Sequence, residues 1–286
     1  MNHVPMRDPD LPPIDYLLIG HLTADLMLDG SRRLGGTTAY AAATAAAFRL
    51  RVGVVTSAAP DDPLLEQLRQ WARVHLIPAA ATTTFENLYE PDGRRQFVRA
   101  LAAPLTPESV PTVWRHTPAV HLAPIAGEVS DALPGCCNNH VLLTLQGWLR
   151  QWESDGLVRF RRWCDAAVLR HINVVVLSEE DIRAAPDLEQ DLAHSCETLL
   201  LTQAERGGTC YERASAWRYA AFPVHVIEPT GAGDVFAAAL LAAHIHAGQG
   251  LRQAVMVAAR LAANAVTRPG LQGTPTPDEV AAALEG

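Results

Sequence analysis

The sequence lacks the features of a membrane or exported protein. No apolar run reaches the length of a membrane span, and residues 1–5 carry neither the basic start nor the apolar core of a signal peptide. We therefore expect a cytoplasmic protein with no membrane partner.

Basic clusters are also scarce. Arg94-Arg95 and the arginines within 159–162 form short, separate groups, and the formal net charge of the chain is −8. A dedicated nucleic-acid-binding protein usually carries a basic face, so we expect no nucleic-acid partner and interpret both groups as solvated surface.

Cysteine is too sparse and too irregularly spaced for a disulfide framework. The five cysteines form an odd set in a chain of 286 residues, which predicts reduced thiols. Cys136-Cys137 and His140 lack a second ligand pair at a suitable spacing, so we expect no structural metal there.

What remains is the pattern of a globular protein with a large core. Hydrophobic residues make up 49% of the chain and charged residues 19%. Strand-like segments that are apolar throughout alternate with helical segments, which predicts an α/β fold: a three-layer sandwich with a mostly parallel central sheet. The expected strands are 14–19, 52–56, 120–123, 141–145, 172–177 and 198–202, and the expected helices are 36–48, 63–73, 160–170, 187–195, 233–246 and 251–266.

One region departs from this alternation. Residues 82–99 alternate polar and apolar side chains around Pro91-Asp92-Gly93, which predicts a β-hairpin with one solvated face. Together with strands expected within 22–34, this hairpin is predicted to form a small sheet that acts as a lid over the site. A peripheral hairpin with no catalytic part is the alternative.

The segment Thr230-Gly231-Ala232-Gly233-Asp234 carries the strongest chemical signal. The glycines let the backbone approach a ligand, and the free amides at the start of the following apolar helix attract an anion. An aspartate beside a phosphate is best explained as a base for an incoming hydroxyl. A tight turn with Asp234 as a helix cap is the alternative, and 224–227 is expected to be the strand that precedes the turn.

These motifs resemble the ribokinase-like (PfkB) family of carbohydrate kinases in their order, over about 15 to 284. The resemblance implies one kinase domain spanning 1–286, with Asp234 as catalytic base and Gly231, Ala232 and Gly233 as an anion hole. It also implies a small sugar or polyol as the substrate, ATP and Mg²⁺ as cofactors, and a monomer or homodimer. The family usually has aspartate where Glu228 stands, which leaves a requirement for K⁺ open.

The resemblance also implies an acceptor site in the first half of the chain. Asp25 matches the substrate-binding aspartate and Gly35-Gly36 the substrate-side diglycine, while Tyr40 stands where many members have asparagine. Asn87 of the hairpin and Arg150 are further candidates for substrate binding. The forms Gly-Gly-x-x-x-Tyr and Gln-Gly-x-x-Arg (146–150) look more like the inositol-kinase-like branch. A turn or cap at Asp25 and an ion pair at Arg150 are the alternatives.

The second half of the chain supplies the candidates for donor binding. The family's Asn-x-x-Glu element reads Ser-x-x-Asp at 178–181, which makes Asp181 and Glu180 candidate magnesium ligands through water. Residues 202–208 resemble the family's nucleotide-binding segment, which implies contacts from Thr202 and Gly207. The resemblance also implies contacts from Thr230, directly before the anion hole, and from Asn264 on the helix expected over 251–266.

Our first hypothesis is therefore an ATP-dependent kinase for a sugar or polyol, with inositol-like acceptors preferred. A nucleoside kinase that stacks a base on Tyr40, Phe85 or Tyr89 is the second. A non-catalytic sensor of sugar or nucleotide is the third, and the intact Asp234 argues against it.

Overall fold

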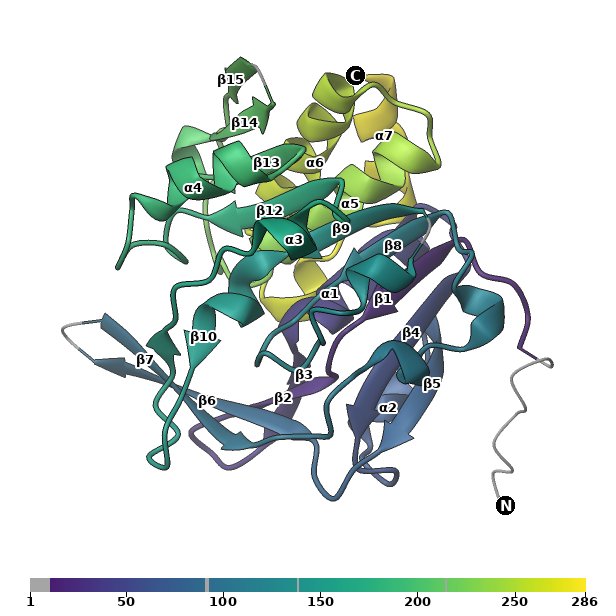
Figure 1. The fold of residues 1–286 in the computed structure, drawn as a ribbon, viewed down its shortest axis with the longest axis vertical. Coiled ribbons are helices and arrows are strands. Elements are labelled where there is room, and N and C mark those ends of the chain that lie inside the picture. The colour runs from purple at the N-terminus through teal and green to yellow at the C-terminus, as the bar shows by residue number, and fades with distance from the viewer. Residues whose placement is uncertain (1–10, 91–92, 138, 214) are drawn as a thin grey trace.

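The computed structural model describes residues 11–90, 93–137, 139–213 and 215–286. A nine-stranded sheet runs through the centre of the molecule in the order β15-β14-β13-β12-β9-β8-β1-β4-β5 (Figure 1). In this spatial order, all neighbouring strands between β13 and β5 pair in parallel. At the other edge, β14 and β15 are added in antiparallel pairing. The strand bounds are β1 Tyr16–Ile19, β4 Val52–Ala58, β5 Ala72–Pro78, β8 Ala119–Leu122, β9 His140–Thr144, β12 Val174–Ser178, β13 Thr198–Thr202, β14 Gly208–Glu212 and β15 Ser215–Tyr219.

Helices cover both faces of this sheet, because successive side chains of each strand point to opposite faces. In β1, for example, Tyr16 and Leu18 belong to one apolar core cluster, while Leu17 and Ile19 belong to the other. The first cluster includes α1 (Gly36–Ala47), α2 (Leu64–Leu68), α5 (Ala232–Ile245), α6 (Leu251–Ala265) and α7 (Pro277–Glu285), and the second includes α3 (Ala166–Leu169) and α4 (Leu188–Ser195). The predicted three-layer α/β fold is confirmed.

A second, small sheet projects from the large one (Figure 1). Its order is β3-β2-β6-β7, with β2 Thr23–Leu26, β3 Arg32–Gly35, β6 Thr83–Glu90 and β7 Gly93–Ala100. The pairings β2–β3 and β6–β7 are antiparallel, and β2–β6 is parallel. Both strand pairs lie where the sequence predicts them, although residues 91–92 of the expected turn lie outside the described part of the chain. We call these four strands the small sheet.

Three element predictions are wrong. The helix expected over 63–73 is limited to α2, and the chain then enters β5, because Val74 and Leu76 pack against the core from a sheet edge. The helix expected over 160–170 begins only at Ala166, where the Asp165 side chain accepts hydrogen bonds from the first-turn amides. A short ladder of β10 (Arg150–Gln151) and β11 (Arg159–Phe160) precedes it.

The third error concerns 224–227. These residues form no strand, and the side chains of Val224, Val226 and Ile227 are 38%, 52% and 61% exposed. The amides of Ile227 and Glu228 donate to the carbonyl of Val266, at 2.8 and 3.1 Å, so the segment is tied to the end of α6 and not to a sheet.

Within the described residues, no helix is long and apolar enough to span a membrane. All five cysteines are described, and none forms a disulfide.

Candidate active site

The start of α5 presents backbone amides next to a carboxylate. Gly231 caps the helix with φ at 85°, in the left-handed region that favours glycine. The amides of Gly231, Gly233 and Asp234 have no backbone acceptor within the described residues, while that of Ala232 donates to the Pro229 carbonyl over 3.3 Å. Three such amides and the positive end of a helix dipole suit the binding of an anion. The Ala232 amide is less available for it than the sequence predicts.

Asp234, in the first turn of α5, has an unusual ionisation. Burial raises its pKa to about 6, while a hydrogen bond from Thr37 and the charge of Arg150 act in the opposite direction. The charge of Asp181 raises the pKa further. A carboxyl with this pKa is suited to accept a proton near neutral pH.

Thr37 is a candidate site residue that the sequence does not predict. It lies in the first turn of α1, its side chain is 1% exposed, and its hydroxyl forms no hydrogen bond of ordinary length and angle with any described group. The hydroxyl nevertheless lies close enough to the Asp234 carboxyl to lower its pKa. The only sequence signal for it is its place directly after Gly35-Gly36.

Arg150 supplies positive charge near Asp234. Its guanidinium donates to the carbonyl of Ile125 at 3.1 Å and lies 5.9 Å from the ring centroid of Phe85, a residue of the small sheet. The chain contains no lysine, so every permanent cation that it can offer to a phosphate is an arginine. The substrate role of Arg150 stays a prediction.

Asp25 and the two glycines form a tightly packed corner beside α1. Asp25 lies in β2 opposite Arg33, and a Cβ on Gly35 would collide with its carboxylate oxygen. Gly36 has φ at 74°, and a Cβ there would collide with the hydroxyl of Thr23. Glycine is thus favoured at Gly36 by its positive φ and at Gly35 by the approach of the Asp25 carboxylate.

Tyr40 joins the two halves of the site. The ring is 5% exposed, and a Cβ on Gly231 would collide with it. Burial and the charges of Asp234, Glu228 and Asp25 all raise the pKa of the Tyr40 phenol. Tyr40 therefore lies between the start of α5 and the corner of Asp25, Gly35 and Gly36, which we call the acceptor corner after its predicted role.

Asp181 follows the carboxyl end of β12, and its charge acts on Asp234. One of its oxygens accepts from the amide and hydroxyl of Ser178, both at 2.8 Å, and the other accepts from the Gln146 amide at 3.0 Å. The pattern at 178–181 also has the geometry of a local cap, because Ser178 accepts from the Asp181 amide at 3.2 Å. Oxygens of this kind suit magnesium-bound waters.

Glu180 is exposed and lies apart from this contact. It borders an open hollow of about 480 Å³ that Glu179, Arg183 and Gln203 also line.

The candidates for donor binding lie at the end of β13, in the turn after it, before α5 and near the end of α6. Thr202 ends β13 and donates weakly to the Leu177 carbonyl at 3.4 Å, and Gly207 turns the chain with φ at 84° where a Cβ would collide with Tyr219. Thr230 is exposed before α5, and Asn264 is partly buried near the end of α6. The exposed segment 224–227 adjoins that helix end through Val266.

Two further positions have defined structural contacts. The carboxylate of Glu228 accepts from the amide of Gly270 at 3.0 Å, which ties the segment before α5 to the loop after α6. Asn87 accepts from Gln96 across the hairpin at 3.0 Å. This bond gives Asn87 a role within the small sheet beside its predicted contact with substrate.

Comparison with known proteins gives a family match over most of the chain. The model of the pfkB family carbohydrate kinases matches residues 30–279. An inositol 3-kinase of Zea mays is 24% identical over 260 residues, which cover 81% of this chain and 66% of that protein. Two further curated relatives are 32% and 27% identical, and the chain spans only 39% of the length of the first and 55% of the length of the second.

Solved structures show the same fold at low identity. A pyrophosphate-dependent kinase of the ribokinase family, complexed with a pyrophosphate analog and myo-inositol, is 21% identical with a TM-score of 0.79, and the match covers 93% of this chain and 99% of that one. The ribokinase of Arabidopsis thaliana, complexed with ribose and ATP, is 16% identical with a TM-score of 0.71, covering 96% and 99%.

Proposed function

Because the chain belongs to the PfkB family of carbohydrate kinases, we propose that it transfers the terminal phosphoryl group of ATP to a hydroxyl of a small polyol or sugar, with inositol-like acceptors preferred. The observation that carries this proposal is the partly buried Asp234, whose pKa is raised to about 6 beside free helix amides. A pure binding protein gains nothing from a base next to an anion site.

Asp234 is the proposed base. Its carboxylate takes the proton of the acceptor hydroxyl while that oxygen forms its bond to the terminal phosphorus, and the bond from this phosphorus to the bridging oxygen of the donor breaks. The free amides of Gly231 and Gly233 donate to the transferring phosphoryl oxygens, and Arg150 adds positive charge near Asp234. Bound Mg²⁺ would neutralise the donor phosphates, with Asp181, and more remotely Glu180, holding its waters.

The acceptor is proposed to lie between the small sheet and α1. Asp25 accepts hydrogen bonds from neighbouring hydroxyls, and Gly35-Gly36 let the acceptor approach the backbone. The hydroxyl of Thr23 borders the same corner, and that of Thr38 lies on α1; each residue is 1% exposed and its hydroxyl has no partner among the described residues. A ring with several hydroxyls suits this concentration of unpaired polar groups, and the inositol kinase relatives support the same acceptor class.

The donor is proposed to be ATP because an apolar surface is available for a base. Val224, Val226 and Ile227 are exposed beside the end of α6 that carries Asn264. Inorganic pyrophosphate, the donor of a structural relative, would use the α5 amides without that surface.

A two-way assay tests acceptor and donor together. Polyols, hexoses and nucleosides are each incubated with Mg-ATP or Mg-pyrophosphate, and the phosphorylated product is quantified by mass spectrometry. We expect product from an inositol-like polyol with ATP. Product with pyrophosphate alone would refute the ATP assignment, exclusive phosphorylation of nucleosides would refute the polyol assignment, and absence of any product would refute the kinase proposal.

The pH profile should report the Asp234 carboxyl. Because the base acts as carboxylate and its pKa is about 6, kcat/KM is expected to be constant above about pH 7 and to fall about tenfold per pH unit below about pH 6. Steady-state rates between about pH 4.5 and 8.5 measure this, with coupling enzymes in excess at each pH. If kcat/KM begins to fall only at about pH 4 or lower, a group other than Asp234 controls the rate.

A further inference from the structure

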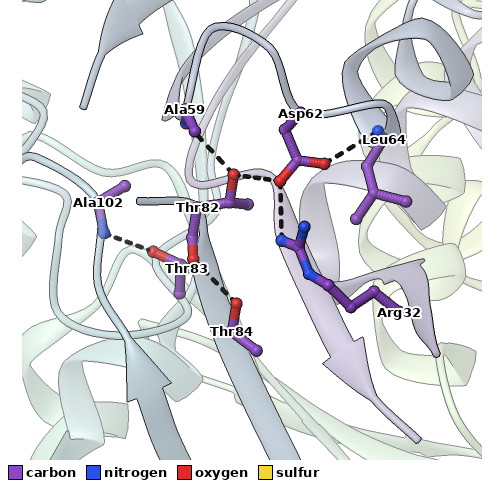
Figure 2. A network of polar contacts seen from close by, with 8 residues as sticks. All are labelled: Arg32, Ala59, Asp62, Leu64, Thr82, Thr83, Thr84 and Ala102. Carbon is purple, nitrogen blue, oxygen red and sulfur yellow. Dashed lines mark hydrogen bonds and ion pairs between the residues drawn. The ribbon is translucent and has the colours of Figure 1, made fainter. Parts of the chain in front are cut away.

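Thr82, the residue before β6, is held by a buried carboxylate. Its hydroxyl donates to Oδ2 of Asp62 at 2.5 Å and accepts from the amide of Ala59 at 3.2 Å (Figure 2). Thr82 is 4% and Asp62 7% exposed. The hydroxyl thus relays a hydrogen bond from the loop after β4 to the point where the chain enters the small sheet.

Thr83, the next residue, is held in the same manner on the other side. Its hydroxyl accepts from the amide of Ala102 at 3.0 Å and bonds Nδ1 of His21 at 2.7 Å. Nε2 of His21 lies 2.8 Å from the carbonyl of Ala103, an acceptor, which makes Nε2 the donor and Nδ1 the acceptor. Both connections of the β6–β7 hairpin to the large sheet therefore meet at one buried imidazole.

Asp62 reaches a second strand of the small sheet. Its Oδ2 also accepts from Nη2 of Arg32, the first residue of β3, at 2.7 Å, and Oδ1 accepts from the amide of Leu64 at 3.1 Å (Figure 2). The Asp62 side chain is 2% exposed and that of Arg32 37%. Leu64 begins α2, whose leucines are buried in the main core, so the carboxylate is fixed to a rigid element.

The topology gives this contact its significance. In the order β3-β2-β6-β7, the strand between the two that Asp62 holds is β2. Asp25, the proposed acceptor ligand, lies in β2 and is paired with Arg33 of β3 on one side and Phe85 of β6 on the other. A carboxylate that restrains both neighbours of β2 restrains Asp25 as well.

We propose that Asp62 is a positioning residue for acceptor binding: through Arg32 and Thr82 it holds β3 and β6, and thereby fixes Asp25 on the intervening β2 over the acceptor site. This inference rests on the proposed kinase function. Asp62 touches neither reacting atom, so it acts only through the position of the small sheet.

The charge of Asp62 makes the contact strong. Burial raises the pKa of its carboxyl, but the hydrogen bonds from Thr82, the Leu64 amide and Arg32 outweigh burial and hold the pKa below its usual value. Removal of Arg32 leaves a buried carboxylate with neutral donors only, which weakens the restraint on β3 while the bond to Thr82 remains.

Arg32→Ala tests the proposal by a split between kinetic constants. We expect KM for the acceptor to rise about 5- to 30-fold, with kcat and KM for the donor changed less than about twofold, because only the acceptor side is displaced. Arg32→Lys should recover part of the loss. Arg51→Ala is the matched control, because Arg51 forms a two-bond ion pair with Asp15 away from the small sheet and should change none of these constants.

The reciprocal variant separates positioning from folding. Asp62→Asn keeps an acceptor oxygen for the Leu64 amide but puts an NH2 donor where Oδ2 accepts from Arg32 and Thr82. The double variant with Arg32→Ala should therefore raise the acceptor KM no further than Asp62→Asn alone. Additive effects, or equal rises in donor and acceptor KM, would overturn the proposal.

Hydrogen exchange tests the restraint without any substrate. In the free protein, amides of β2 and β3 should exchange faster in Arg32→Ala than in the parent, and those in Arg51→Ala should not. Unchanged exchange would overturn the proposed restraint even if the enzyme is a kinase. If the parent protein phosphorylates no acceptor but Arg32→Ala still exchanges faster, the restraint is supported and only the kinase function is refuted.

Discussion

Asp234→Asn is expected to lower kcat by about 10² to 10⁴, with KM for acceptor and donor changed little. Asparagine keeps the shape of the side chain but cannot take the hydroxyl proton as the oxygen attacks phosphorus. The raised pKa of about 6 indicates that the parent carboxyl is matched to this task near neutral pH. Single-turnover rates with saturating substrates measure the chemical step directly. Full turnover in the folded variant would show that Asp234 is not the base.

The same substitution should stabilise the fold, which distinguishes lost chemistry from lost structure. Burial raises the folded-state pKa of Asp234 to about 6 from 3.8, so ionisation of this group opposes folding above pH 6. We expect Asp234→Asn to raise the free energy of unfolding at pH 7 by about 1–3 kcal/mol. The difference should shrink as the pH falls from about 6 to about 4, because the parent carboxyl then binds its proton. Urea unfolding at both pH values measures it.

The features that can be predicted from sequence are those encoded locally. The turn and helix from 231 onward follow from two glycines before an apolar run, and the hairpin of 82–99 follows from its alternation. The acceptor corner is predicted only through the family resemblance, since nothing in the local sequence places Asp25 against Gly35.

The features that sequence patterns miss depend on contacts between distant segments. Residues 224–227 have the β-branched composition of a strand, but the amide of Ile227 bonds the end of α6 and the side chains remain exposed. Asp62 has the sequence context of a turn residue after β4, and only the fold brings Arg32 and Thr82 to it. Thr37 likewise acquires a role only when α1 packs against α5.

Gly231→Ala is expected to lower kcat/KM by about 10² to 10³, because it displaces an amide that is proposed to stabilise the transferring phosphoryl group. Alanine is disfavoured at φ 85°, and its Cβ would collide with the Tyr40 ring. The start of α5 must shift to relieve both, and with it the amides and Asp234. Steady-state kinetics measure the loss. Activity within about twofold of the parent would refute the role of this turn.

The contribution of Tyr40 can be isolated from backbone strain. Gly248 has φ at 66°, and a Cβ added there would meet no atom within 4 Å, so Gly248→Ala bears the strain alone, about 1 kcal/mol in the free energy of unfolding. Gly231→Ala should lower the free energy of unfolding by more than this, because its Cβ also collides with the Tyr40 ring. In a Tyr40→Ala background that excess should disappear, because the ring that the methyl meets is gone. If the excess persists, the turn is constrained by something other than Tyr40, and the link that this ring makes between acceptor corner and anion site is wrong.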